Sequence, residues 1–163
     1  MKLVLFDVEG VLLQSDGEGM RSLDAVNGIK EYLALLQKDG HVVGVLTAQT
    51  AQELGDQLTK AEVEEAFKFG VFGDGSRVTQ EMVKSAVREA AKYSPVSFGK
   101  RDVYWVVASA RNVRVAKELG LRAIAVATGS ERVEQLANAG ADFLFSDFSH
   151  VKSMVLAVEP HIY

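Results

Sequence analysis

Cysteine is absent from the 163-residue sequence, and proline occurs only twice. Without cysteine the chain forms no disulfide, no thiolate metal site and no thiol nucleophile. Positive charge is also scarce, with 18 Lys and Arg residues against 22 Asp and Glu residues and a formal net charge of −4. This balance argues against a nucleic-acid partner, because binding to phosphates through counterion release needs clustered Lys and Arg.

Long hydrophobic runs are missing as well. No stretch approaches the roughly 20 apolar residues of a membrane-spanning helix, and the apolar run at 3–6 is too short for a secretory signal peptide. We therefore expect no membrane partner and a cytoplasmic location. Hydrophobic residues still make up 48% of the chain. The length is close to that of one domain of roughly 150 residues, so we expect a single domain over residues 1–163.

Short apolar runs alternate with longer amphipathic stretches. The runs fall at 3–8, 42–46, 69–72, 103–107, 123–126 and 143–145. Most of them are continuous in Val, Leu, Ile and Phe, which is typical of strands covered on both faces in a parallel sheet. Apolar residues recur at helical spacing between them, and Gly40 and Gly120 follow two of these patterns as stop signals. This order predicts an α/β fold with a mostly parallel, doubly wound sheet.

Ligands of such sheets bind beyond the carboxyl ends of the strands. The residues that directly follow the strands are therefore the first candidates for function. The candidate segments are 7–10, 47–49, 73–77, 108–112 and 128–130. We interpret the last of these, Thr128-Gly129-Ser130, as a turn that caps a helix starting at Glu131.

Asp7-Val8-Glu9-Gly10 is the most informative of these segments. A carboxylate at the end of a buried strand is held rigidly, and Gly10 lets the backbone bend without a Cβ clash. Two carboxylates at this spacing suit covalent phosphoryl transfer, in which one attacks phosphorus and the other exchanges a proton. The alternative is that Asp7 and Glu9 only initiate a turn.

Nearly the whole chain resembles the haloacid dehalogenase (HAD) superfamily of phosphohydrolases, in particular its phosphoglycolate-phosphatase-like branch. Four stretches carry the resemblance: the first motif at 7–11, a strand ending in Thr at 38–47, the stretch 116–129 after the fourth motif, and the ending at 139–143. The resemblance implies a Rossmann-like three-layer sandwich. The first loop holds only about sixteen residues before the first helix, including most of the irregular segment 14–24, so we expect a minimal cap or none.

The resemblance also implies roles for individual residues. Asp7 takes the nucleophile position and Glu9 the general acid/base position, where the family usually has Asp. The hydroxyl of Thr47 and the backbone N–H of Ala48 would bind a phosphate oxygen. Arg77 is the candidate for the basic residue that neutralises the transferred phosphoryl group, and the alternative is that Arg77 is a solvated loop charge.

The family's fourth motif, Gly-Asp-x-x-x-Asp, is degenerate in this chain. Its acids help to hold Mg²⁺, but Ala108 and Asn112 stand at the two Asp positions. The ion would then depend on the carboxylate of Asp7 and the backbone carbonyl of Glu9. Since Mg²⁺ binds proteins through carboxylates, we expect it to bind weakly or not at all. Metal charge supplies several kcal/mol in such chemistry, so we also expect impaired catalysis.

Two functions remain open at this point. The first is a phosphatase with at most weak activity on a small phosphorylated metabolite. The second is a non-catalytic descendant, a pseudoenzyme that binds an oxyanion or a protein partner. Arg111 bears on the second: one hypothesis places its guanidinium in the crevice, and the alternative leaves it with Arg114 on a solvated helix face. A chain without a cap also suits a homo-oligomer, whose neighbouring subunit closes the site.

A phospho-accepting receiver domain is a third candidate, because it also uses an Asp on a parallel sheet. Receiver domains place that Asp after the third strand. Here Phe72 is followed by Gly73-Asp74-Gly75, without a matching acidic pair after the first strand. We therefore disfavour this function.

Overall fold

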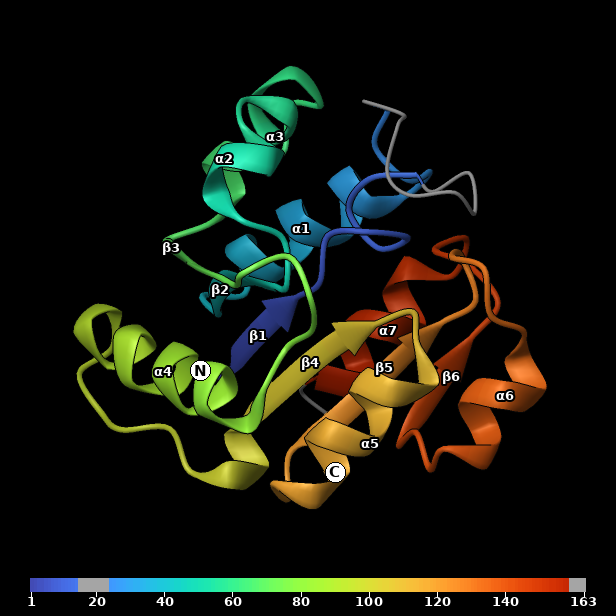
Figure 1. Cartoon of the computed structure of the whole chain (residues 1–163). Helices are drawn as coiled ribbons and strands as arrows, with labels where there is room; N and C mark the ends of the chain where they lie inside the picture. Colours follow the sequence, from blue (N-terminus) through green and yellow to red (C-terminus); the bar gives the residue numbers. More distant parts are fainter. Residues whose placement is uncertain (15–23, 159–163) are drawn as a thin grey trace.

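The computed structural model describes residues 1–14 and 24–158, and these contain one six-stranded parallel sheet (Figure 1). The strands are β1 (Leu3–Phe6), β2 (Val42–Thr47), β3 (Phe69–Phe72), β4 (Val103–Val107), β5 (Arg122–Val126) and β6 (Phe143–Phe145). Their order across the sheet is β3-β2-β1-β4-β5-β6, and all neighbouring pairs are parallel. Each strand coincides with an apolar run, which confirms the predicted doubly wound α/β fold.

Helices cover both faces of this sheet. They are α1 (Ile29–Lys38), α2 (Ala51–Leu54), α3 (Gln57–Lys60), α4 (Gln80–Ala90), α5 (Ala110–Glu118), α6 (Val133–Asn138) and α7 (Val151–Val158). Short 3₁₀ turns lie at Glu64–Ala66, Ala91–Tyr93 and Lys100–Asp102. Helices α1 and α7 pack together on one face, and α4, α5 and α6 cover the other, which gives three layers (Figure 1).

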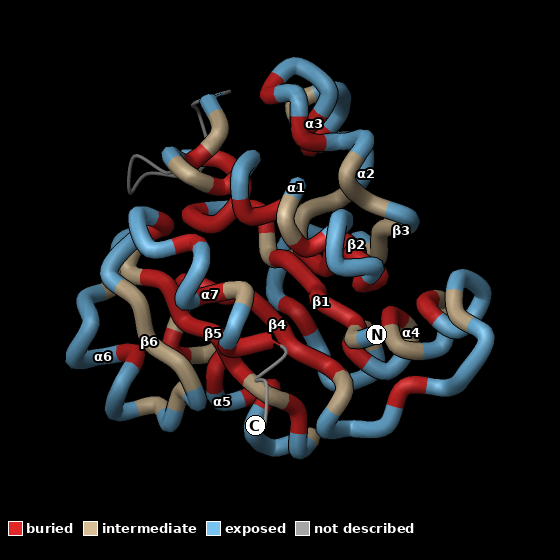
Figure 2. Tube along the Cα trace, turned by 180° about the vertical axis from the view of Figure 1, so that it is seen from behind, coloured by how far each residue is buried: buried red, intermediate tan, exposed pale blue. Residues whose placement is uncertain are grey.

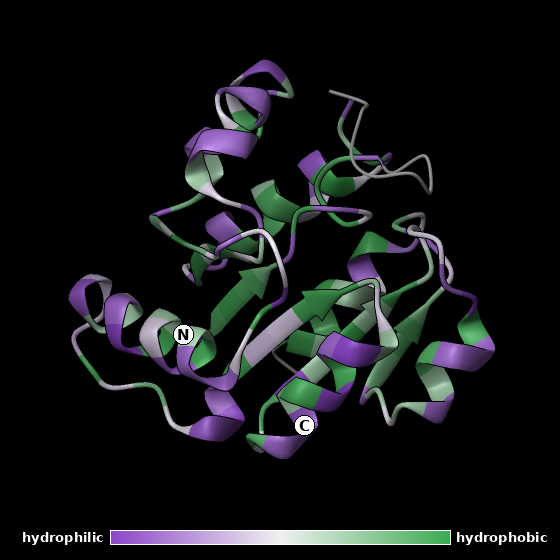
Figure 3. Cartoon of the chain, in the orientation of Figure 1, coloured by the Kyte–Doolittle hydropathy of each residue, from purple (hydrophilic) through white to green (hydrophobic). Residues whose placement is uncertain are grey.

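Alternate residues of the central strands belong to two separate hydrophobic clusters. On β1, Val4 and Phe6 join the cluster of α1 and α7, whereas Leu3 and Leu5 join the cluster of α4 and α5. Trp105 on β4 belongs to the second cluster. The central strands β1, β2, β4 and β5 form a buried band in Figure 2, and the strands are largely apolar in Figure 3. Burial on both faces explains why their sequences lack polar alternation.

Some sequence expectations concern less regular parts of the chain. The segment 14–24 lies largely outside the described residues, which resume at Asp24. The stretch 94–101 is a loop that leads into the 3₁₀ turn at Lys100–Asp102. Among the helices of the described ranges, none combines the length and the apolar character needed to cross a membrane.

The strand order determines where a ligand crevice lies. The strand order reverses at β1: the chain runs from β1 to β2 and β3 on one side, and then crosses to β4, which pairs with β1 on the other side. The loops after β1, β2 and β4 leave at one end, called here the carboxyl end of the sheet, and the strands begin at the opposite amino end. Crevices in open α/β sheets form at the carboxyl end beside such a reversal.

Candidate functional site

Asp7 directly follows β1, and its carboxylate is held by two hydrogen bonds. The backbone N–H of Val8 donates to Oδ1 (2.8 Å), and Nδ2 of Asn112 donates to Oδ2 (2.9 Å). The backbone N–H of Asp7 donates to the carbonyl of Val106 on β4 (3.1 Å). Burial raises the pKa of Asp7 from 3.8 to about 7, although both hydrogen bonds to the carboxylate act in the opposite direction.

Asn112 reaches Asp7 from the first turn of α5. Ser109 caps this helix, because its Oγ accepts a hydrogen bond from the backbone N–H of Asn112 (3.2 Å). Asn112 is buried, and its Oδ1 lies 3.4 Å from Nη1 of Arg111. The residue at the second acid position of the fourth motif therefore donates a hydrogen bond to Asp7, where an Asp would share a cation with it.

Asp7 and Asn112 border a cavity of about 250 Å³ at the carboxyl end of the sheet. All five residues singled out in the sequence line it: Asp7, Glu9, Thr47, Ala48 and Arg77. Its wall is completed by Gln49, Ser76, Val78, Ser109, Arg111 and Asn112. The fold thus brings the sequence candidates from three separate loops to one cavity, called the crevice below.

Thr47 and Ala48 form the part of the crevice that follows β2. Thr47 is buried, and its Oγ1 accepts a hydrogen bond from the backbone N–H of Gln49 (3.2 Å), which leaves the hydroxyl proton for another acceptor. The backbone N–H of Gly75 donates to the carbonyl of Ala48 (2.7 Å). This bond fixes the loop after β3 beside the loop after β2, and the exposed Arg77 belongs to that same loop.

Arg111 also lines the crevice, as the crevice hypothesis for this residue expects. It is half-buried, and its Nη1 donates to the carbonyl of Val78 (2.8 Å). Arg114 is exposed and does not contribute to the crevice wall. Two arginines, Arg77 and Arg111, therefore line the same cavity as Asp7. Guanidinium groups suit bidentate binding of oxyanions.

A second cavity of about 230 Å³ adjoins Asp7 toward the loop after β5. Its wall includes Ala108 and Glu131. Both carboxylate oxygens of Glu131 lie 3.1 Å from the backbone N–H of Ala110 at the start of α5. Sequence reasoning missed Glu131, and the available signal was its position a few residues after a strand. An acid at a helix N-terminus stabilises the helix by interacting with its dipole.

The interpretation of residues 128–130 as a helix cap is wrong. Helix α6 begins at Val133, and the side chain of Gln135 accepts a hydrogen bond from the backbone N–H of Arg132 (2.7 Å) at the helix start. Thr128 instead donates its hydroxyl proton to the carbonyl of Gly10. A hydroxyl residue before an apolar run predicts a cap, but this one is used for a contact between loops.

The loops after β1 and β5 meet over Ala108. A Cβ on Gly10 would lie 2.8 Å from Cα of Gly129, and Gly10 has φ +76°. A Cβ on Gly129 would lie 3.2 Å from Cβ of Ala108. The close approach and the positive φ therefore require glycine at position 10, whereas a Cβ at position 129 would need a small shift of Ala108. Ala108 lines the cavity of about 230 Å³, so a longer side chain at position 108 has room toward it.

These donors do not fit a magnesium ion. Within residues 1–14 and 24–158, no three His, Cys, Asp or Glu side chains are grouped as metal ligands. Ala108 has no donor atom, Asn112 directs its amide nitrogen to Asp7, and Glu131 binds the start of α5. In the family pattern the ion is held by the first-motif Asp and the two fourth-motif Asp residues. Of the three corresponding positions here, only Asp7 carries a carboxylate, and Mg²⁺ needs oxygen ligands in octahedral geometry.

The sequence matches one family model, and the fold matches many solved structures. Residues 6–126 match the model described as haloacid dehalogenase-like hydrolase. A search of curated proteins gave no significant match. A protein of Thermotoga maritima, named as a candidate β-phosphoglucomutase, has a TM-score of 0.79 and 14% identity; the alignment covers 97% of this chain and 100% of that chain.

Two further solved structures show the same fold. A protein of Clostridium difficile, named as a candidate phosphatase, has a TM-score of 0.76 and 17% identity, with 95% of this chain and 98% of that chain covered. A variant of CbbY from Rhodobacter sphaeroides, in complex with xylulose 1,5-bisphosphate, has a TM-score of 0.72 and 16% identity, with 91% and 95% covered. At these identities the similarity concerns the fold alone.

Proposed function

The chain belongs to the haloacid dehalogenase-like hydrolase family, and we propose that it binds a small phosphorylated metabolite in its crevice and hydrolyses it slowly at most. The family generally uses Mg²⁺. One observation carries the proposal: Asn112 donates a hydrogen bond to Asp7 (2.9 Å). In the family pattern a cation lies between the two acids at these positions. Here the two side chains are hydrogen-bonded directly, so the carboxylate of Asp7 has a partner without an ion.

The wall of the crevice supports the binding half of the proposal. Thr47, Ala48, Arg77 and Arg111, whose hydroxyl, backbone N–H and guanidinium groups are hydrogen-bond donors, all line the same volume of about 250 Å³. A phosphate ester offers several acceptor oxygens, and hydrogen bonds from charged donors to such oxygens are roughly twice as strong as neutral ones. The volume lies below the range of about 300–1,000 Å³ of drug-sized ligand pockets, so it suits a small ligand.

The same residues limit the hydrolytic half. An anionic Asp7 repels a phosphate dianion, and the donor set offers no cation site to offset that repulsion. Because burial raises its pKa to about 7, roughly half of the Asp7 carboxyls carry a proton at neutral pH and cannot attack phosphorus. Losing about 4 kcal/mol of transition-state stabilisation lowers a rate roughly a thousandfold.

Glu9 adds a smaller limitation. Its side chain is one methylene longer than the Asp of the family pattern, so its carboxyl group sits over an angstrom further from the backbone. Misplacements of about 1 Å at a reacting group cost up to roughly a hundredfold in rate. Glu9 would still move a proton, but from a position less suited to the leaving oxygen.

A phosphatase assay tests the hydrolytic half. The substrate is p-nitrophenyl phosphate, with and without Mg²⁺, and Asp7→Asn is the control. We expect the wild-type rate to stay close to that of Asp7→Asn under both conditions. Calorimetry with inorganic phosphate in EDTA tests the binding half, and we expect binding to persist. If the wild type shows metal-dependent turnover and Asp7→Asn abolishes it, the proposal that the site is impaired is refuted.

Non-catalytic oxyanion binding is a second candidate function, and the position of Arg111 favours it. Under this alternative the crevice binds its ligand without any turnover. Arg111→Ala should weaken phosphate binding in EDTA about tenfold, which corresponds to 1.4 kcal/mol. Arg114→Ala, on the same helix but outside the crevice wall, is the matched control. Equal phosphate affinities of the two variants would show that Arg111 does not contribute to phosphate binding.

A further inference from the structure

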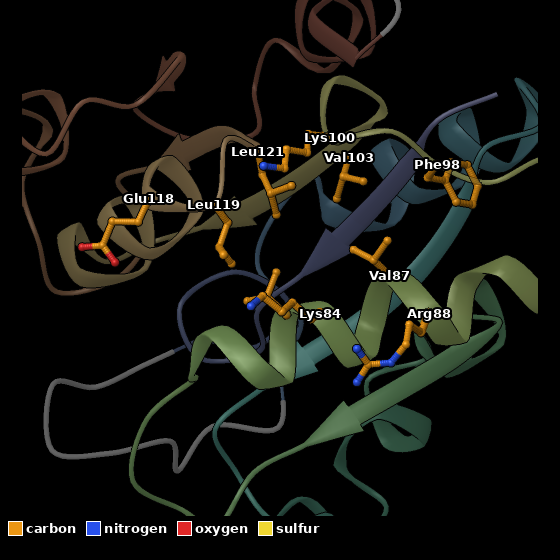
Figure 4. A pocket seen from close by; sticks show the side chains of 10 residues that line it. Lys84, Val87, Arg88, Phe98, Lys100, Val103, Glu118, Leu119 and Leu121 are labelled. Atoms are coloured by element: carbon orange, nitrogen blue, oxygen red, sulfur yellow. The ribbon is translucent and has the colours of Figure 1, made fainter.

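A cavity of about 430 Å³ lies at the amino end of the sheet, away from the crevice (Figure 4). Three segments build it: the middle of α4, the stretch 98–103 before and at the start of β4, and the turn 118–121 between α5 and β5. None of its lining residues belongs to the crevice wall. We call it the amino-end cavity.

The floor of the amino-end cavity is apolar. Its apolar side chains are Val83, Val87, Phe98, Val103, Leu119 and Leu121. Four of them belong to the hydrophobic cluster between the sheet and α4, and they are at most 9% exposed. A ligand that covers such a floor gains about 25 cal/mol for each Å² of apolar surface removed from water. The floor therefore favours the hydrocarbon part of a ligand.

Cations surround this apolar floor. Lys84 and Arg88 come from α4, Lys100 comes from the segment before β4, and Glu118 is the one acid of the lining (Figure 4). Three positive side chains and one negative side chain leave the wall with a net charge of +2. The whole chain has a net charge of −4. The cavity is therefore a local positive site on an acidic protein, and such a site attracts anions.

The α4 cations have weak partners. Nη2 of Arg88 donates to the neutral hydroxyl of Ser85 (3.0 Å). Nζ of Lys84 lies 3.8 Å from a carboxylate oxygen of Glu81, and both side chains are at least half exposed. Exposed ion pairs contribute little, on the order of 0–1 kcal/mol. Both cations can therefore turn toward a ligand at little cost.

Lys100 is held over the cavity by the turn at Gly120. A Cβ on Gly120 would lie 3.3 Å from Cδ of Lys100, so the aliphatic part of Lys100 crosses this glycine. Asp102, the nearest acid along the chain, forms an ion pair with Lys2 (2.7 Å). Lys100 itself forms no ion pair within the described ranges 1–14 and 24–158. Its ammonium group thus lacks a carboxylate counterpart there.

We propose that the amino-end cavity binds a small amphipathic anion, namely a medium-length acyl chain or an aromatic ring that carries one carboxylate. The hydrocarbon part covers the apolar floor, and the carboxylate lies among Lys84, Arg88 and Lys100. The excess of positive charge determines the sign of the ligand. The volume determines its size, since 430 Å³ lies within the range of small-molecule pockets.

Octanoate is the probe, and Trp105 is the reporter. Trp105 is the sole tryptophan, and it lies buried in the same hydrophobic cluster as Val83, Phe98 and Val103. We expect octanoate to change its fluorescence in a saturable way. Octanol has the chain without the charge, and acetate has the charge without the chain. Both should bind at least about tenfold more weakly. Equal affinity of octanoate with either one, or no saturable binding of octanoate, would overturn the proposal.

A pair of double variants locates the site. Arg88→Gln with Lys100→Gln removes two cations of the wall, and Lys38→Gln with Lys152→Gln removes two exposed lysines of α1 and α7 on the other face. We expect the first pair to weaken octanoate binding at least about tenfold and the control to change it less than about twofold. Heat denaturation verifies that both remain folded. Equal affinities would overturn the assignment.

Sedimentation separates a small ligand from a second copy of the chain. A ligand-free dimer that dissociates in the Arg88→Gln, Lys100→Gln variant would also overturn the proposal, because a neighbouring copy would then fill the cavity. A monomer in both variants supports it. Failure of this proposal leaves the crevice unaffected, since phosphate binding there is measured separately.

Discussion

The two ends of the sheet carry polar groups in opposite arrangements. At the carboxyl end, Asp7 accepts hydrogen bonds from Val8 and Asn112, and Glu131 accepts one from Ala110. At the amino end, cations surround an apolar floor, with a single acid among them. The first end satisfies the carboxylates of Asp7 and Glu131 with donors of the protein, and the second has an excess of positive side chains in its cavity wall. The comparison shows that a motif locates a site, whereas the hydrogen bonds and charges around it indicate which ligand the site suits.

Desolvation explains this difference. A carboxylate in an enclosed site is costly unless it is hydrogen-bonded or paired with a cation. At Asp7, the hydrogen bond that Nδ2 of Asn112 donates provides part of this compensation. The cations at the amino end remain in contact with water, so they need no partner of this kind.

Restoring the missing acids should have the largest effect, because it changes the charge at the carboxyl end of the sheet. Ala108→Asp with Asn112→Asp replaces a methyl group and an amide donor by two carboxylates beside Asp7. We expect Mg²⁺ to bind and to raise the rate on p-nitrophenyl phosphate at least about a hundredfold, since roughly 3 kcal/mol of metal stabilisation suffices for this. Mg²⁺ should also raise the melting temperature of this variant.

Asn138→Asp with Ser153→Asp is the matched control, because it adds two carboxylates at exposed positions of α6 and α7. It should show neither the rate increase nor the metal-dependent melting. If the restored variant also stays inactive and insensitive to Mg²⁺, the missing acids are not what limits metal binding and catalysis in the crevice.

Asp7→Asn should have the next largest effect, and it depends on pH. The folded protein holds a proton on Asp7 up to about pH 7, whereas the unfolded chain releases it near 3.8. The wild-type protein therefore loses stability as pH rises between these values. We expect the variant to exceed the wild type by about 2 kcal/mol at about pH 8 and to show no advantage at about pH 4. Urea unfolding at both pH values measures this difference.

Asp39→Asn, at the exposed end of α1, controls for the replacement of a carboxyl group by an amide. If Asp7→Asn gives the same stability difference at both pH values, burial does not raise the pKa of Asp7. The carboxyl end would then be less enclosed than its hydrogen bonds indicate.

Thr128→Val tests the contact between the loops after β1 and β5. It removes the hydroxyl that donates to Gly10, and Gly10 is buried. We expect a loss of about 1 kcal/mol in the free energy of unfolding, because a buried carbonyl loses its donor. Thr59→Val, at an exposed position, should cost less than about half of that. Equal losses would show that the contact between the loops does not contribute to stability.

Glu118→Gln should give the smallest effect, and it sharpens the description of the amino end. The carboxylate of Glu118 accepts a hydrogen bond from Nε2 of Gln80 (2.9 Å), which an amide oxygen can also accept. Removing the one negative charge of the lining should raise octanoate affinity about twofold, as expected for an exposed charge. Trp105 fluorescence measures it. A weaker affinity would mean that net charge does not govern this cavity.

The fold could be predicted from the sequence because the central strands are buried on both faces and the edge strands β3 and β6 are still apolar. Continuous apolar runs therefore marked all six strands, and Gly40 correctly marked the end of α1. The main error at a boundary was β1, which ends at Phe6 and not at Val8. Val8 is fully buried, so burial alone kept the apolar pattern going after the strand had ended.

Several residues that line the crevice could be predicted from the sequence, but the hydrogen bonds around it could not. Asp7, Thr47 and Arg77 follow parallel strands, and such positions converge at one end of the sheet. The bond between Glu131 and Ala110 joins two separate loops across the fold. No local spacing reports such a contact. The amino-end cavity was missed for a similar reason, because its lining comes from three separate segments of the chain.

The central position of β1 has a consequence for synthesis. Its two neighbours come from distant parts of the chain, with β2 ending at Thr47 and β4 ending at Val107. A ribosome that adds 5–20 residues per second needs roughly 3–12 s for the intervening stretch of about 60 residues. During this time one side of β1 presents unpaired backbone groups that other chains can join. Nascent chains therefore need protection at this side of β1 until β4 emerges.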